Sequence, residues 1–481
     1  MAALLLGGAM APVFAADVKN LSVTVSSGTQ ANAYGGYTIE EGASALQNAL
    51  TLSGPAKVLG ASAGGWSRWG NAEWNTLTIR LDEDGLLGPS DIVGGGVAES
   101  EGGGAAVHNT VYIESGTVEG TVEGGVAVGI NGVGDGTGDV LSNQVTMSGG
   151  TIYSVFGGET GEGNANDNVV TIKGSAAVTG KSNVVYGGYT IDGNASGNIV
   201  NIEDDADIHG EIMGGYTRAG SLISGNKVNV TGGNVNENTV YGVYTAYGDV
   251  LDNQAVIKGT GQAGSSDTNS VYAGFTNIGA AAGNILYIQD SAEIAGSAFA
   301  GYQGGFISSE TVERNQVFMS GGSVGGDLTG GGSNNGGETL NNYVEITGGT
   351  VSGNVYSGFT DSADALENTL TVAGGRVEGS LFGGYSNTGT ANENKLTFSA
   401  GTAGSDAYGG YAQEGADGNE AVLSGTSVLE GNAAGGSSAR GEASGNSLTI
   451  KENSDVKGDA AGGDVYMGTI SKNIITIQYN A

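Results

Sequence analysis

One segment, Val184–Ile202 (VVYGGYTIDGNASGNIVNI), contains two patterns that return along the whole chain. The first, here called the box, runs from Val185 to Thr190 and consists of an aliphatic residue, an aromatic residue, two glycines, a second aromatic residue and threonine. The second is an asparagine followed by alternating apolar residues, as in Asn198, Val200 and Ile202. Self-similarity at a period of about 20–50 residues is typical of repeat proteins. The chain is therefore expected to fold as an array of similar units.

Both patterns recur about every 27–30 residues, and sixteen units carry both. The second glycine of the box, or its replacement, falls at Gly36, Gly65, Gly95, Gly125, Gly158, Gly188, Gly215, Val243, Gly274, Gly301, Gly331, Gly358, Gly384, Gly410, Gly436 and Gly463. The asparagine falls at Asn48, Asn75, Asn109, Asn143, Asn168, Asn198, Asn226, Asn253, Asn284, Asn315, Asn342, Asn368, Asn394, Asn419, Asn446 and Asn473.

Within a unit, apolar residues alternate in short runs bounded by glycine and asparagine, which is a strand pattern. The unit that begins at Asn342 divides into Asn342–Thr347, Thr350–Gly353 and Asn354–Thr360. Three short strands per turn describe one coil of a parallel β-helix, a fold that stacks its repeats along one axis. The sequence thus predicts an all-β solenoid of about sixteen coils of about 26–33 residues, with three short strands in each coil.

The recurring asparagine shares its strand parity with apolar residues, as Asn342 does with Val344 and Ile346. Residues of one parity point to one side of a strand, so the asparagine is expected inside the coil or at its corner. Amides stacked in register can form a hydrogen-bonded ladder. The predicted ladder includes Asn168, Asn198, Asn226, Asn253, Asn284, Asn315, Asn342, Asn368 and Asn394. The box glycines are expected where φ is positive or where backbone approaches closely at a corner.

The two aromatic residues of a box lie three positions apart, so an unbroken strand would place them on opposite faces. One row would then be core and the other an exposed stripe. Stacking that stabilises the coil is one interpretation. A contact surface for glycans or proteins is the other, with Tyr186, Tyr241, Tyr272 and Tyr356 as candidate binding residues.

All three tryptophans, Trp66, Trp69 and Trp74, fall within nine residues near the N-terminal end. One interpretation is a cap over the first coils, since terminal repeats must protect exposed strand edges. The other is a carbohydrate-binding platform built from the faces of the indole rings.

Catalytic and metal chemistry find little support in the sequence. The chain has no cysteine and only two histidines, His108 and His209, so thiol catalysis and histidine-rich metal sites are not expected. The acidic runs at Asp82-Glu83-Asp84 and Glu203-Asp204-Asp205 lack the spacing of known Ca²⁺ loops, and solvated turns are the expected structure. No cofactor or metal is predicted, and the chain is not expected to be an enzyme. The alternative is a secreted polysaccharide lyase or hydrolase that uses paired carboxylates.

A net charge of −34 argues against a nucleic-acid partner, which needs a basic surface. Residues 1–16 (MAALLLGGAMAPVFAA) have the apolar stretch and small-residue cleavage site of a signal peptide without its basic start. We therefore expect residues 1–16 to direct export, residues 17–157 to form irregular N-terminal coils with a cap, and residues 158–481 to form regular coils truncated at the C-terminus.

Tandem units of the type N-x-V-x-I-x-G-G-x-V…V-Y-G-G-Y-T, rich in glycine and asparagine, acidic and free of cysteine, resemble the passenger region of Gram-negative autotransporters. The resemblance covers roughly residues 20–481 and rests on repeat style. It implies a right-handed parallel β-helix, displayed on the cell surface or secreted, with an adhesive or structural role. The implied partners are glycans or proteins of host or bacterial surfaces, or further copies of the chain.

The C-terminal end departs from the family pattern. Autotransporters continue into a translocator barrel of the outer membrane, whereas this sequence stops at Ala481, in a unit begun at Asn473. We expect the full-length gene product to encode that barrel.

Overall fold

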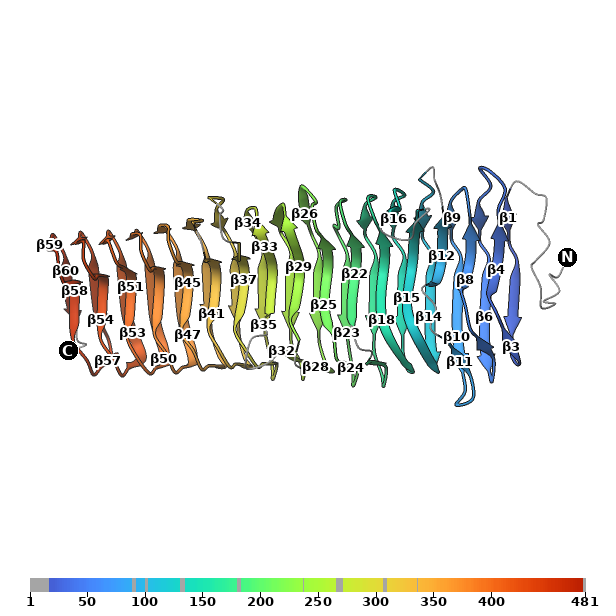
Figure 1. Cartoon of the computed structure of the whole chain (residues 1–481). Helices are drawn as coiled ribbons and strands as arrows, with labels where there is room; N and C mark the ends of the chain where they lie inside the picture. The colour runs from blue at the N-terminus through green and yellow to red at the C-terminus, as the bar shows by residue number, and fades with distance from the viewer. Residues whose placement is uncertain are drawn as a thin grey trace. The chain divides into compact units, whose positions relative to one another are not determined.

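A computed structural model describes residues 17–88, 92–99, 103–129, 135–179, 183–236, 238–264, 271–305, 309–334 and 336–478. The expected signal peptide, residues 1–16, lies outside these ranges. The described chain is all-β, and its parallel strands stack as a β-solenoid of about 16 turns, which confirms the predicted fold class. The chain divides into two compact units, Met1–Asn238 (unit 1) and Thr239–Ala481 (unit 2). In each unit the strands lie side by side with their arrows parallel (Figure 1).

Each regular coil contributes strands to four rows. The first row follows the ladder asparagine, the second is short, the third contains the box, and the fourth is a strand of two or three residues before the next asparagine. The fourth row corrects the prediction of three strands per coil. The extra strand lies between the box and the next asparagine, where Ala365–Leu366 (β46) pairs with Ala391–Asn392 (β49). A strand of two residues is too short to show an alternating pattern in the sequence, so only its pairing with neighbouring coils reveals it.

In unit 1 the first row contains β2 (Ser22–Val25), β6 (Ala49–Gly54), β10 (Thr76–Leu81), β14 (Thr110–Ser115), β17 (Gln144–Met147), β20 (Val169–Ile172), β23 (Ile199–Ile202) and β27 (Lys227–Val230). The second contains β3 (Thr29–Gln30), β7 (Lys57–Val58), β11 (Leu86–Leu87), β21 (Ala177–Val178), β24 (Asp207–Ile208) and β28 (Asn234–Asn236). The third contains β4 (Ala33–Thr38), β8 (Ser62–Ser67), β12 (Val93–Glu99), β22 (Val184–Thr190) and β25 (Glu211–Thr217). Two long strands, β15 (Thr117–Val128) and β18 (Thr151–Thr160), run through the second and third rows. The fourth contains β1 (Val18–Lys19), β5 (Ala45–Leu46), β9 (Ala72–Glu73), β13 (Ala106–Val107), β16 (Val140–Leu141), β19 (Ala165–Asn166) and β26 (Leu222–Ser224).

In unit 2 the first row contains β31 (Gln254–Ile257), β35 (Ile285–Ile288), β39 (Gln316–Met319), β43 (Tyr343–Ile346), β56 (Ser447–Lys451) and β60 (Ile474–Gln478). The second contains β32 (Gln262–Gly264), β36 (Glu293–Ile294), β40 (Ser323–Val324), β44 (Thr350–Val351) and β57 (Asp455–Val456). Here β47 (Thr369–Val377), β50 (Lys395–Ala403) and β53 (Glu420–Leu429) join the first and second rows.

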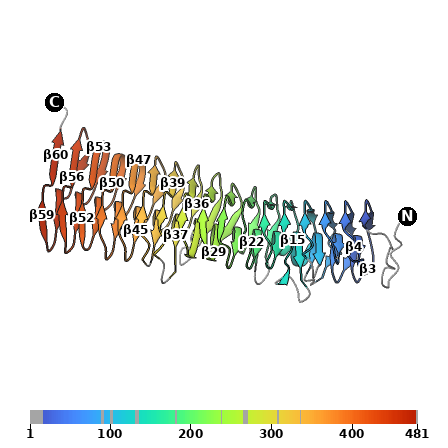
Figure 2. The same ribbon diagram turned by 90° about the horizontal axis from the view of Figure 1, so that it is seen from above.

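The third row of unit 2 contains β29 (Val240–Tyr247), β33 (Val271–Ile278), β37 (Ala298–Gln303), β41 (Leu328–Ser333), β45 (Val355–Thr360), β48 (Leu381–Ser386), β51 (Ala407–Ala412), β54 (Ala433–Ser438) and β58 (Ala460–Val465). The fourth contains β30 (Asp249–Leu251), β34 (Ala281–Ala282), β38 (Val312–Glu313), β42 (Thr339–Leu340), β46, β49, β52 (Gly415–Asp417), β55 (Glu442–Ser444) and β59 (Thr469–Ser471). Seen from above, β47, β50, β53 and β56 form one layer, and β45 and β52 lie on the opposite side (Figure 2).

The core of each coil is filled by the apolar residues that alternate in the first and third rows. In β43, Val344 and Ile346 are buried between half-exposed neighbours. Register carries this pattern from coil to coil, because Val344 pairs with Val317 on one side and Leu370 on the other. A one-residue slip would expose the apolar set, so the alternation fixes the register.

The asparagines form a continuous hydrogen-bonded ladder within each unit. The backbone N–H and Nδ2 of Asn284 both donate to Asn315 Oδ1, at 3.0 and 2.9 Å. Asn284 Nδ2 also donates to the Val250 carbonyl at 3.1 Å, while its Oδ1 accepts two bonds from Asn253. The side chain is fully buried. A buried amide with all its donors and acceptors used stabilises the stack, whereas a broken set is costly.

A left-handed residue stands immediately before every ladder asparagine. Eleven of these sixteen residues carry a Cβ. Positive φ is uncommon for such residues, so a regular row of them marks a fixed corner. The row contains Gln47, Trp74, His108, Ser142, Asp167, Gly197, Gly225, Asp252, Gly283, Arg314, Asn341, Glu367, Glu393, Gly418, Gly445 and Lys472, all with φ between 54° and 69°. The corner turns the fourth-row strand into the first-row strand and presents the asparagine inward.

The box glycines serve close approach rather than a positive φ. A Cβ at Gly358 would lie 2.3 Å from Asn368 Nδ2, and one at Gly274 would lie 2.4 Å from Asn284 Cγ. The second glycine therefore makes room for the ladder amide of its own coil. Val243 occupies this position in one coil and is buried; the contacts seen do not explain how its bulk is accommodated.

Candidate functional site

The two aromatic residues of each box lie on the same side of the strand, so the prediction of opposite faces is wrong. In β22 the rings of Tyr186 and Tyr189 stack with their centroids 5.7 Å apart. In β4, buried and half-buried residues alternate up to Gly35 and again from Gly36 onward, but the two glycines are both buried. The alternation therefore changes phase at the glycine pair. The register of β22 with β25 passes from Tyr186↔Met213 to Gly188↔Gly215 and omits the first glycine. Glycines without a Cβ permit this local break in the pleat.

The rings form a double row on the outer side of the third-row strands, with gaps at coils that carry other residues, such as Thr329 and Gly332 in β41. In unit 2, Tyr241 stacks on Tyr272 at 5.2 Å and Tyr272 stacks on Phe299 at 5.0 Å. The double row thus has two files, one built from the first ring of each box and one from the second. In the second file, Tyr244 and Phe275 stack at 5.1 Å. The double aromatic row contains Tyr34, Tyr37, Trp66, Phe156, Tyr186, Tyr189 and Tyr216 in unit 1. In unit 2 it contains Tyr241, Tyr244, Tyr272, Phe275, Phe299, Tyr302, Tyr356, Phe359, Phe382, Tyr385, Tyr408 and Tyr411.

Stacking determines which parts of these rings a ligand can touch. Where stacked rings of one file have centroids near 5 Å apart, the face of each ring is covered by the ring of the next coil. Ring edges and hydroxyl groups are left at the half-exposed surface. Burial raises the pKa of Tyr34 to about 12 and raises the pKa of Tyr302 and Tyr356 further. These phenols are therefore neutral hydrogen-bonding groups at physiological pH.

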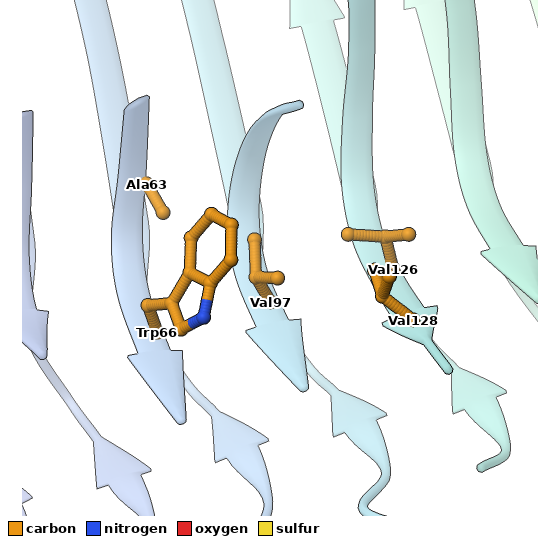
Figure 3. Close-up of a cluster of buried hydrophobic side chains, with 5 residues drawn as sticks. All are labelled: Ala63, Trp66, Val97, Val126 and Val128. Carbon is orange, nitrogen blue, oxygen red and sulfur yellow. The ribbon is translucent and has the colours of Figure 1, made fainter. Parts of the chain in front are cut away.

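The three tryptophans do not share one surface. Trp66 is only 9% exposed and belongs to a buried cluster with Ala63 of its own strand, Val97 of the adjacent β12, and Val126 and Val128 of β15 on the other side of β12 (Figure 3). Its Nε1 donates to Glu99 Oε2 at 3.2 Å. Trp69 is half-buried beside Arg68, whose guanidinium carbon lies 5.9 Å from the indole centroid.

Trp74 is the left-handed residue of its corner, is 57% exposed and stacks on His108 of the next corner at 4.2 Å. The structure therefore distributes the three indoles over the double aromatic row, a turn and a corner. The two interpretations of a common cap or a common sugar platform both require the rings to be together.

Two glutamates interrupt the double aromatic row in unit 1. Glu123 in β15 and Glu159 in β18 stand at box positions where β22 carries Tyr186 and Tyr189. Their side chains hydrogen-bond to each other, and burial raises the pKa of Glu159 to about 7. Sequence reasoning missed this pair. The only available signal was the replacement of an aromatic residue by glutamate in two adjacent boxes.

The remaining candidates for chemistry are surface groups. His209 Nε2 lies 3.0 Å from Asp207 Oδ2, and both side chains are exposed. Asp82 Oδ1 accepts a bond from the Asp84 backbone N–H at 3.0 Å in a tight turn. Over the described ranges, no group of three or more His, Asp or Glu side chains is placed to hold a metal ion. Nor does that part of the chain contain a helix with the length and apolarity to cross a bilayer.

Comparison with known proteins adds no relative: no protein-family model, no curated protein and no solved structure matches the chain. What is shown is a parallel β-helical repeat protein with a ladder of buried amides and an outer double aromatic row.

Proposed function

We propose that this chain is an extracellular β-solenoid with an adhesive or structural role, and that the double aromatic row is its contact surface. The observation that carries the proposal is the phase change at the glycine pair, which brings both rings of a box to one outer face. Half-exposed tyrosines combine an apolar body with a hydroxyl group, a combination enriched at protein interfaces. Repetition along consecutive coils would supply many weak contacts at once, which raises overall avidity.

The arrangement favours a protein or cell-surface partner that contacts ring edges and hydroxyls. A sugar that stacks on ring faces would find those faces covered inside each file. Tyr408 illustrates the polar side of this surface: its hydroxyl donates to Asp406 Oδ2 at 3.1 Å.

The alternative, a polysaccharide lyase or hydrolase, draws no support from the Glu123–Glu159 pair. Glycoside hydrolysis requires two carboxyl groups separated by about 5–10 Å, with room for the substrate between them. These two carboxyl groups are hydrogen-bonded to each other, and Glu123 is only 1% exposed.

Adhesion of beads coated with the full chain to cultured epithelial cells tests the contact surface. Replacing Tyr244 and Tyr385, both half-exposed in the double aromatic row, by serine is expected to reduce bead retention several-fold. The matched control is Tyr247→Ser, because Tyr247 is 54% exposed and lies outside the row. Equal retention by all three proteins would reject the row as the contact surface, and prior protease or glycosidase treatment of the cells would assign the partner class.

Export and surface display are a separate proposal, supported by the apolar N-terminal segment and by the passenger-like repeat style. The expected result is that protease added to intact cells of the source organism degrades the chain while cytoplasmic proteins survive. Recovery of the intact chain only after lysis would contradict export.

A further inference from the structure

Glu123 and Glu159 stand at two positions of the double aromatic row that lie diagonally across adjacent strands. In other coils these two positions carry aromatic rings. Register pairs Glu123 with Phe156 and pairs Val126 with Glu159, so the two glutamates are diagonal neighbours on adjacent strands. The same diagonal places Phe156 and Tyr189 at 5.7 Å and Tyr356 and Tyr385 at 5.5 Å. Two carboxyl groups thus replace two rings in direct contact.

The surroundings of the pair are apolar. Val122 and Val126 are fully buried beside Glu123, and Phe156 is 8% exposed beside Glu159. Transfer of an ionised carboxylate to such a place is unfavourable unless it is paired with a cation.

Few other ionisable groups face the pair. Strands β16, β17, β19, β20 and β21, which surround β18, carry no ionisable side chain. From β22 come Tyr186 and Tyr189, and from β12 comes Glu99, which accepts the Trp66 bond. Glu119 lies on β15 itself. Arg218, the cation that acts on Tyr189, forms an ion pair with Asp192 at 2.8 Å.

A hydrogen bond between two carboxyl groups requires at least one proton. When that proton is lost, two like charges stand in contact in a region of low dielectric, and repulsion replaces the bond. We propose that Glu123 and Glu159 form a proton-dependent clasp that holds β15 to β18 at low pH and loosens them at high pH.

The clasp would act on the outer surface of unit 1. On one side of it lies the cluster of Trp66, Val97, Val126 and Val128, and on the other lie the stacked rings of Tyr186 and Tyr189. Loosening at the clasp would separate these two parts of the double aromatic row. The burial-raised pKa of Glu159 is consistent with a transition near neutral pH.

Hydrogen exchange on the full chain tests the clasp. After correction for the intrinsic pH dependence of exchange, amides of residues 121–128 and 153–160 are expected to lose about tenfold in protection between pH 5.5 and 8.5. Glu159→Gln removes the titrating group while keeping a hydrogen-bonding side chain, so its protection should not change with pH. Glu119→Gln is the matched control on the same strand and should keep the wild-type step.

A step that persists in Glu159→Gln, or its absence in the wild type, would overturn the proposal. Should Glu159→Gln fail to fold by circular dichroism, carbon-13 titration of the wild-type glutamate side chains decides the matter. Two coupled macroscopic steps are expected from the pair. Two independent titrations at the ordinary pKa of an exposed glutamate would overturn the clasp.

Discussion

At the scale of single residues, the buried asparagine decides whether a coil can stack. In Asn284→Leu the N–H and Nδ2 of Asn253 lose their acceptor, and Asn315 Oδ1 loses the Nδ2 donor of residue 284 and keeps the backbone N–H. We expect a loss in the free energy of unfolding of at least about 1–3 kcal/mol, the usual cost of unsatisfied buried polar groups. Urea denaturation followed by circular dichroism measures it.

The control for that substitution is Asn387→Leu, at an exposed asparagine whose Nδ2 donates to Asp361 at 2.8 Å. Surface substitutions of this kind usually change stability by less than about 0.5 kcal/mol. Equal effects at the two positions would contradict a special role for the ladder.

The left-handed conformation of the corner residue has an energetic cost that a substitution can measure. Gly418 has φ 67°, and a Cβ added there would meet only Glu393 Cγ at 3.5 Å. Gly418→Ala therefore isolates the backbone cost of about 1–2 kcal/mol for a residue with a Cβ in this conformation. Gly418→Asn should lose less, because asparagine visits the left-handed region more readily. Thermal unfolding of the two variants should rank them in that order; the reverse ranking would contradict the account.

At the scale of elements, the box strand packs closely against the ladder asparagine at the corner of the same coil. This close packing is possible because the second glycine of the box has no Cβ. Gly358→Ala would place a methyl group within 2.6 Å of all three terminal atoms of the Asn368 side chain. Since overpacking in a tight core costs about 1–3 kcal/mol and the ladder bonds would also shift, we expect a loss at the upper end of that range. Chemical denaturation of the purified variant measures it.

Ser357→Ala provides the comparison at the adjacent position, which already carries a Cβ. Its hydroxyl donates to the Thr369 carbonyl at 2.7 Å, so about 1 kcal/mol is expected from the lost bond. A cost for Gly358→Ala no greater than this one would show that the strand moves freely away from the corner.

The same elements show where local pattern stops being informative. Parity along Asn342, Val344 and Ile346 correctly indicates one inward face, because that strand is unbroken. Parity along Tyr186 and Tyr189 fails, because the pleat changes phase at Gly187 and Gly188. Alternation predicts faces only within a continuous pleat.

At the scale of the whole molecule, stability should depend on pH through unit 1. The folded pKa of Glu159 is raised to about 7 from an ordinary 4.5, so the folded state binds this proton more tightly than the unfolded state. The resulting stabilisation is complete below about pH 4.5 and is lost as pH rises through 7. We expect about 1–3 kcal/mol, because Glu159 retains some exposure and each pKa unit corresponds to about 1.4 kcal/mol.

Calorimetry at pH 5 and pH 8 measures this dependence. In Glu159→Gln the part of the melting-temperature difference that arises from the pair should disappear, whereas Glu119→Gln should retain it. An identical pH dependence in Glu159→Gln and the wild type would exclude the pair as its source.

The sequence by itself determined the repeat length, the rows of alternating strands, the inward asparagine and the need for glycine in the box. Each of these follows from periods short enough to be seen along one strand or from one unit to the next. Only the tertiary structure decided that both box aromatics share a face, that corners hold left-handed residues such as Glu367 and Lys472, and that Glu123 meets Glu159. Those features depend on how far each coil bends and which side chains the next coil brings into register. Residues 25 or more positions apart along the ladder, such as Asn394 and Asn419, set that geometry jointly.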